Sequence, residues 1–263
     1  MKNILLTFDV EEFDYPREVG LGISDKEMHS ISYKGTKEIL KLLNKYKITA
    51  TFFITANFAQ KYPKMIRDIS KKHEVASHGY LHSHDYKTMN KNKAVFYIRK
   101  SKEALEKITG KRVYGFRAPK FQAPKYSALE GIFEYDSSIN PTYIPGRYNN
   151  FFKRRIIHKR GDLIIVPASV TPVIRLPLFW IAFRNFGLGY GKFCTRACFL
   201  SGDYVNLLFH PWEFTDVSRF RKLGLAVKGT GNRLISMLDE YITWAKKNKY
   251  KFDTIHNYLN IKI

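Results

Sequence analysis

The stretch ILLTFDVEE at residues 4–12 joins a short apolar run to a cluster of acidic side chains. Residues 4–8 are typical of a buried strand, which is expected to end where Asp9 begins the acidic cluster. Asp9 and Glu11 are two residues apart, so in extended backbone their side chains point to the same side. Carboxylates at the end of a buried strand are costly unless a cation balances them. Either a cation therefore lies beside this pair, or the cluster forms a solvated loop.

Beyond this stretch, short apolar runs alternate with amphipathic helical patterns. The other expected strands are residues 48–54, 74–77, 112–116, 133–137, 163–166, 204–209 and 251–255. The expected helices are residues 33–46, 58–72, 90–108 and 232–247, and Gly110 is a C-cap for the third of them. This alternation predicts an α/β fold with a mostly parallel sheet, and about seven such units indicate a barrel. With no linker and no internal repeat, residues 1–263 are expected to form a single domain.

Composition narrows the class of protein and its partners. The 263 residues are 44% hydrophobic and 15% aromatic, which excludes a disordered chain. Lys and Arg number 45 against 23 Asp and Glu, and the net charge of +22 favours a polyanionic partner. Nucleic acid is not expected, because the chain has no helix-turn-helix, RRM or OB signature. The basic run at residues 153–155 is expected to be solvated surface, and Cys194 and Cys198 to be buried thiols on one helix face.

The chain shows no signal peptide and no run of about 18 apolar residues, so a cytoplasmic location is expected. Residues 174–184 are apolar and aromatic with flanking arginines, which are the ingredients of a peripheral anchor on an anionic membrane. Trp180 would then lie at the headgroup level. The alternative for this segment is a core strand and turn near the active site.

Histidines follow two of the expected strands. His78 and His82, four residues apart, can reach one metal from a tight loop, and imidazole suits zinc. His210 ends the apolar run 204–209 and is either a hydrogen-bonded core residue or a site residue. Because barrel active sites lie at the carboxyl ends of strands, these histidines and the acidic pair supply a metallohydrolase with ligands, a base and an acid.

Five short motifs follow one another along the chain. They are Thr7-Phe8-Asp9-x-Glu11, Ser77-His78-x-x-x-His82, Gly115-Phe116-Arg117-Ala118-Pro119, Tyr135-Asp136-Ser137-Ser138 and Phe209-His210-Pro211-Trp212-Glu213. In this order they resemble the motifs of the polysaccharide deacetylase family, the NodB-type carbohydrate esterases, over nearly the whole chain. The last two motifs are most similar to the branch found with bacterial exopolysaccharide clusters.

The resemblance implies a distorted (β/α) barrel of about seven strands, of the NodB-homology type, and a hydrolase that acts on linear amide C–N bonds. The substrate would be an N-acetylated amino sugar in free, polymeric or lipid-linked form. By the resemblance, Glu11, His78 and His82 would bind one divalent metal, expected to be Zn²⁺. Asp9, oriented by Arg117, would be the general base. His210 would be the general acid.

Two positions depart from the family pattern. Val10 separates two acids that are usually adjacent, and Glu11 replaces the usual Asp, which lengthens the ligand arm by one methylene. Lys120 stands where many members have Tyr, although a backbone N–H near Pro119 could still stabilise an oxyanion.

Four residues are candidates for binding the substrate, namely Pro119, Lys120, Asp136 and Trp212. Asp136 either orients a substrate group or caps a turn. Trp212 either stacks on a sugar ring or packs in the core. Glu213 is expected to hydrogen-bond a site histidine from behind.

Two other functions remain open. A metal-free amidohydrolase of the same fold would act on a small cyclic amide, but the spacing of His78 and His82 favours a metal. A non-catalytic module that binds anionic glycans is suggested by the net charge.

Overall fold

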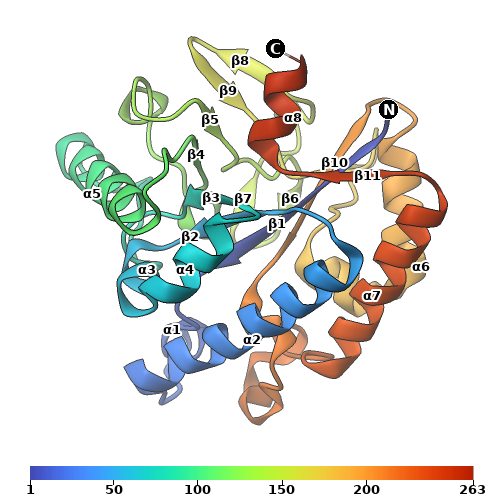
Figure 1. The fold of residues 1–263 in the computed structure, drawn as a ribbon, viewed down its shortest axis with the longest axis horizontal. Coiled ribbons are helices and arrows are strands. Elements are labelled where there is room, and N and C mark those ends of the chain that lie inside the picture. Colours follow the sequence, from blue (N-terminus) through green and yellow to red (C-terminus); the bar gives the residue numbers. More distant parts are fainter. Residues whose placement is uncertain (263) are drawn as a thin grey trace.

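The first strand pairs with three other strands in a curled sheet (Figure 1). The computed structural model describes residues 1–262. Seven parallel strands have the order β10-β1-β2-β3-β4-β5-β9. Their bounds are β1 (Asn3–Val10), β2 (Thr51–Ile54), β3 (Glu74–Ser77), β4 (Gly115–Phe116), β5 (Tyr135–Asp136), β9 (Leu163–Ile165) and β10 (Tyr204–Phe209).

Short strands complete the edges. β8 (His158–Arg160) pairs antiparallel with β9, and β11 (Lys251–Asp253) pairs with the start of β1. β6 (Tyr143–Ile144) and β7 (Tyr148–Asn149) form a separate hairpin. Where the two ends of the parallel sheet meet, the backbone N–H of Ser169 donates to Asn206 O at 3.0 Å, and the N–H of Asn206 donates to Ser169 Oγ at 2.8 Å. The two ends of the sheet are thus connected through Ser169, which lies beyond β9, and not by pairing of β9 with β10. This incomplete closure confirms the expected distorted barrel.

Helices surround the sheet (Figure 1). They are α1 (Tyr15–Glu18), α2 (Asp25–Tyr46), α3 (Ala56–Lys61), α4 (Pro63–Ser70), α5 (Lys91–Thr109), α6 (Trp180–Cys198), α7 (Asn232–Lys247) and α8 (Ile255–Lys262). Four 3₁₀ segments lie in the connections: η1 (Pro119–Phe121), η2 (Tyr126–Ala128), η3 (Pro211–Phe214) and η4 (Ser218–Ala226). No helix among the described residues is both long and apolar enough to cross a membrane.

The helices differ from the sequence predictions at several places, and α1 and α8 were not predicted. α2 begins eight residues earlier than expected, because Ser24 caps it by accepting from the N–H of Glu27 at 3.2 Å. The helix expected at 58–72 is two helices, since α4 restarts at Pro63. α6 was not predicted as a helix, although Cys194 and Cys198 do lie buried on it as free thiols.

Every residue of β1 is buried, and its two faces pack against different partners. Ile4, Leu6 and Phe8 belong to the cluster beneath the surrounding helices, whereas Leu5 belongs to a second cluster with Phe53 of β2. Because side chains alternate along a strand, Thr7 and Asp9 point to the same side as Leu5. The strand therefore delivers a carboxylate at its carboxyl end into the barrel interior.

Helix α2 contacts η3 at a position where only glycine fits. A Cβ on Gly35 would lie 1.7 Å from the backbone oxygen of Pro211, which directly follows His210. Backbone cannot yield as a flexible side chain can, so Gly35→Ala should lower the free energy of unfolding by about 1–3 kcal/mol or more in urea titrations. Gly189→Ala is the matched control, because Gly189 lies in α6 with open space around it. Its free energy of unfolding should stay equal or rise by up to about 1 kcal/mol; equal losses in both variants would contradict the close packing.

His73, between α4 and β3, makes stability depend on pH. Its ring packs against Phe52 with centroids 5.3 Å apart, and burial, aided by the charge of Lys72, lowers its pKa to about 4. The unfolded chain binds a proton at this site near its ordinary value of about 6.5, so between pH 6.5 and 4 protonation favours unfolding. From pH 7 to 4.5, the wild type should lose roughly 2–3 kcal/mol more than His73→Phe, measured by urea unfolding at each pH. Parallel losses in the two proteins would exclude this role.

Candidate active site

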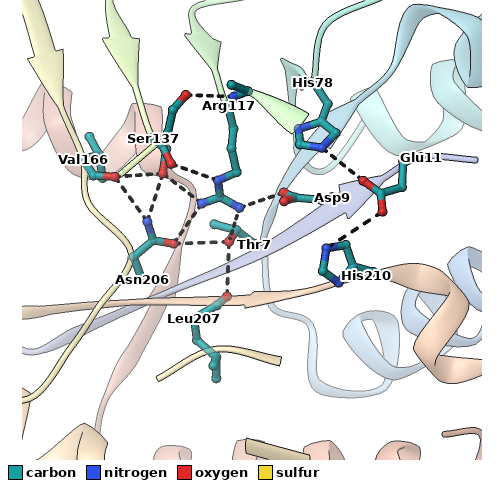
Figure 2. A network of polar contacts seen from close by, with 12 residues as sticks. Thr7, Asp9, Glu11, His78, Arg117, Ser137, Val166, Asn206, Leu207 and His210 are labelled. Carbon is teal, nitrogen blue, oxygen red and sulfur yellow. Dashed lines mark hydrogen bonds and ion pairs between the residues drawn. The ribbon is translucent and has the colours of Figure 1, made fainter. Parts of the chain in front are cut away.

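Polar residues gather at the carboxyl ends of the parallel strands (Figure 2). Asp9 lies near the end of β1 and Glu11 directly follows that strand. His78 follows β3, Arg117 follows β4 and His210 follows β10. Parallel strands bring their carboxyl ends to one edge, so motifs from distant parts of the chain meet there.

Glu11, His78 and His82 form one group of metal-ligand atoms. The Nε2 atoms of His78 and His82 each lie 3.1 Å from Oε2 of Glu11, and all three side chains are buried. Ligand atoms on a tetrahedral zinc ion are roughly 3.3 Å apart, given bonds of about 2.0–2.1 Å. The three donors, within 4.8 Å of one another, therefore fit a single divalent ion. The additional methylene of Glu11 does not keep its carboxylate from the histidines.

The surroundings set the charge of this group. Burial opposes ionisation of Glu11, but His82, His210 and His78 outweigh it and lower the pKa of Glu11 to about 2. Glu11 is thus a carboxylate throughout the working pH range. His82 is oriented by Asp14, whose Oδ1 accepts from Nδ1 at 2.6 Å. Burial lowers the pKa of His82, and the charges of Glu11 and Asp14 outweigh this effect and raise it to about 9. A carboxylate on Nδ1 leaves Nε2 directed at Glu11, as in many metal-binding histidines.

Asp9 is balanced by Arg117. Arg117 is fully buried, and its Nη1 donates to Asp9 Oδ1 at 2.8 Å and to Thr7 Oγ1 at 3.0 Å. Its other nitrogens donate to Ser137 Oγ at 2.9 Å and to Asn206 Oδ1 at 3.3 Å (Figure 2). Of the two possibilities for the acidic cluster, the structure thus shows a compensating cation and not a solvated loop.

His210 lies on the other side of Glu11, with 3.9 Å between its Nε2 and Glu11 Oε1. Oε1 of Glu213 is 3.1 Å from His210 Nδ1 and accepts the backbone N–H of His210 at 2.8 Å. Burial disfavours a charge on this imidazole, but Glu11, Glu213 and Asp9 outweigh burial and raise the pKa of His210. The expected partnership of Glu213 with a site histidine is therefore present.

The structure adds Arg184, which the sequence did not single out. Arg184 is fully buried on α6 and forms an ion pair with Oε2 of Glu213. Its guanidinium also donates to the backbone oxygens of Lys228, at 2.8 Å, and Leu225, at 3.2 Å. In the sequence, the feature that could have indicated a buried role for Arg184 is its position in an apolar, aromatic stretch.

A cavity of about 230 Å³ opens over these groups. Asp9, Glu11, His82 and His210 line its polar side, and aromatic side chains with Lys120 and Arg147 line the rest. Trp212 lines the cavity but is 3% exposed and stacks on Phe13, with centroids 4.8 Å apart. It thus packs in the core as well as bordering the cavity.

Trp180 also lines the cavity, with its ring edge-on to His210 at 5.0 Å between centroids. Phe179 and Phe183, on either side of it, are buried. The segment 174–184 is therefore largely built into the core and the site, and the structure gives no support to the expected membrane anchor. Its alternative, a core segment near the active site, describes these residues.

The other substrate-binding candidates have separate positions. Pro119 is buried at the start of η1, which presents Lys120 to the cavity, where Lys120 pairs with Glu18. Asp136 does not line this cavity: its Oδ1 accepts from the N–H of Ser138 at 3.0 Å and from the Ser138 hydroxyl. Asp136 is thus a turn cap, and burial raises its pKa to about 6.

Comparisons with known proteins agree with this fold. Residues 1–130 match the family model for polysaccharide deacetylase. The chain is 28% identical over 130 residues to the peptidoglycan deacetylase of Helicobacter pylori. The aligned residues are 48% of this chain and 42% of that protein. It is 29% identical over 77 residues to the peptidoglycan-N-acetylmuramic acid deacetylase PdaA of Bacillus subtilis. The aligned residues are 29% of this chain and 29% of that protein. The crystal structure of Puue Allantoinase has a TM-score of 0.67 at 19% identity, covering 97% of this chain and 88% of that one.

The fold is a distorted (β/α) barrel with a group of metal-ligand atoms at the carboxyl ends of its strands. Residues 1–130, just under half of the chain, match the polysaccharide deacetylase family. The chain spans less than half the length of the curated relatives that it matches. The structural likeness, at its low identity, concerns the fold.

The ion pair behind His210 gives a prediction about stability. Arg184→Met leaves the buried carboxylate of Glu213 without its cation and should lower the free energy of unfolding by roughly 3–5 kcal/mol. The double variant Arg184→Met with Glu213→Gln has no buried charge there and should recover part of that loss. Urea unfolding of both single variants and the double variant measures the coupling. Losses that simply add would show that the two side chains do not stabilise each other.

Proposed function

We propose that this chain is a metal-dependent hydrolase that removes N-acetyl groups from an amino sugar in a saccharide. The observation that carries the proposal is the convergence of Glu11, His78 and His82 on one point. An ion-paired carboxylate, Asp9, and a carboxylate-backed histidine, His210, lie beside Glu11 of that group (Figure 2). The family supports the same reaction, since the curated relatives are named as deacetylases of peptidoglycan.

Each side chain has a defined task in this reaction. Glu11, His78 and His82 would hold a divalent ion, expected to be zinc, which when bound would activate the attacking water as a Lewis acid. Asp9 accepts the proton of the attacking water on the carboxylate oxygen that Arg117 leaves free. The backbone N–H of Lys120, next to Pro119, would donate to the amide oxygen as negative charge develops there.

His210 acts on the leaving group. Because Nδ1 is held by Glu213, its Nε2 faces the cavity and donates a proton to the departing amine. A raised pKa keeps this imidazole protonated before the step. An amide nitrogen leaves poorly unless it is protonated, so this donation is required for C–N cleavage.

Two alternatives are less well supported. A metal-free hydrolase of a small cyclic amide would leave three convergent ligand atoms without a role, although a structure named as an allantoinase shares the fold. A non-catalytic glycan-binding module would not need a histidine backed by two buried charges.

A comparison of two variants tests the proposal. Asp9→Asn should retain the metal but lower kcat by roughly 10²–10⁴-fold, since the amide keeps the shape of the side chain but cannot accept the proton. His78→Ala with His82→Ala should lose both the metal and acetate release, because only one ligand remains. Metal content by elemental analysis and acetate release from a chitin oligosaccharide are measured on the same preparations. Stoichiometric metal in the double histidine variant, or near-normal turnover by Asp9→Asn, would contradict these roles.

A further inference from the structure

Two more cavities continue from the active-site cavity. They have volumes of about 300 and 220 Å³, and Phe121 and Tyr148 line all three. Lys120 and Arg147 are shared by the first two cavities, and Lys87 by the second and third. The three cavities therefore lie next to one another in a row. We call the two outer cavities together the side groove.

The side groove is lined by cations. Arg147 and Lys87 are followed by Lys153 and Arg160 in the last cavity. Within residues 1–262, none of these four side chains forms an ion pair with a carboxylate. Lys153, in the run expected to be plain solvated surface, therefore lines a cavity together with other unpaired cations.

The carboxylates along the groove do not cancel this charge. Glu18 is already paired with Lys120. Asp136 is buried, binds Ser138, and is one carboxylate against the three cations Lys87, Lys153 and Arg160 of the same cavity. The far end of the groove consequently has an excess of positive charge that an anionic ligand would neutralise.

The wall between the cavities is built with backbone strain. Lys120 and Phe121 have φ angles of 56° and 58°, two consecutive non-glycine residues in the left-handed region. Such residues cost about 1–3 kcal/mol each and persist where the surrounding structure holds them, often at ligand sites. The Phe121 ring meets Tyr148 edge-on, with centroids 6.4 Å apart, and Asn140 donates to the Tyr148 hydroxyl at 3.0 Å.

We propose that the side groove binds anionic sugar units of the substrate, so that the natural substrate is an acidic saccharide. This rests on the proposed function, which places the N-acetylated unit over Glu11 and its neighbouring units along the groove. The anionic group is a carboxylate, as in a uronic acid, or a phosphate. The net charge of +22 would speed the capture of such a polymer.

Binding measurements on the full-length, metal-loaded protein test this proposal. The probes are three N-acetylglucosamine-containing hexamers: neutral chitohexaose, an alternating oligomer with glucuronic acid, and an oligomer of N-acetylglucosamine 1-phosphate. Titration calorimetry at low and moderate salt should show at least one acidic oligomer binding roughly three- to tenfold more tightly than chitohexaose at low salt, with the advantage reduced by salt. The oligomer that gains more identifies carboxylate or phosphate as the preferred anion.

Matched variants locate the effect. Lys153→Ala with Arg160→Ala should remove most of the preference for the acidic oligomer. Arg99→Ala with Lys107→Ala changes the net charge equally on α5, away from the groove, and should retain the preference. Equal loss in both double variants would assign the effect to net charge and overturn the groove.

Two further results would overturn the inference: equal affinity for the acidic and neutral oligomers, or equally tight binding of a single-stranded DNA of the same charge. Acetate release is recorded separately for all three saccharides. Its absence from every saccharide would contradict the proposed deacetylation, whereas an acidic preference that depends on Lys153 and Arg160 would still be visible in the titrations. Failure of the function and failure of the groove are thus distinguishable.

Discussion

The buried ion pair between Arg117 and Asp9 holds the site together. Arg117 is fully buried, and a guanidinium without partners there would be strongly destabilising. Its bonds reach Thr7 and Asp9 of β1, Ser137 after β5 and Asn206 of β10. One cation thus fixes three strand ends relative to β4, close to the seam where Ser169 joins Asn206. The same constraint that positions the base also keeps the distorted barrel in register, so stability and catalysis depend on one set of contacts.

A second buried arginine repeats this arrangement behind the acid. Arg184 pairs with Glu213 as Arg117 pairs with Asp9. In each pair the arginine is fully buried and the carboxylate is buried too. The difference lies in what each carboxylate faces. Asp9 faces the cavity directly, whereas Glu213 faces His210. In the proposed reaction the two cations would therefore support opposite proton transfers, one that removes a proton from water and one that gives a proton to the amine.

The sequence was sufficient to predict most residues that gather at the site, and the contact of Arg117 with Asp9, but not the arginine behind Glu213. Asp9, His78 and His210 each follow an apolar run of strand length, so the ends of β1, β3 and β10 were predictable. The partnership of Arg184 with Glu213 joins residues 29 apart through a helix that was not predicted. The aromatic residues and three glycines in α6 weaken its helical signal, and tertiary packing overrides that weakness. Asp136 shows the converse: its motif was found, but only the fold shows that it caps a turn outside the catalytic cavity.

The arrangement of charge along the cavities favours one orientation of a bound acidic saccharide. At the inner end, Asp9 and Glu11 are carboxylates within the cavity, and they would repel an anionic group that came close to them. At the outer end, Lys153 and Arg160 are cations without carboxylate partners among the residues described here. A saccharide with both an uncharged N-acetyl group and a negative substituent is therefore favoured in one orientation, with the acetyl group inward and the anion outward. An uncharged saccharide receives no such bias and could slide along the aromatic wall. The groove would then act mainly by positioning the scissile amide, because electrostatic complementarity contributes register and specificity more than raw affinity.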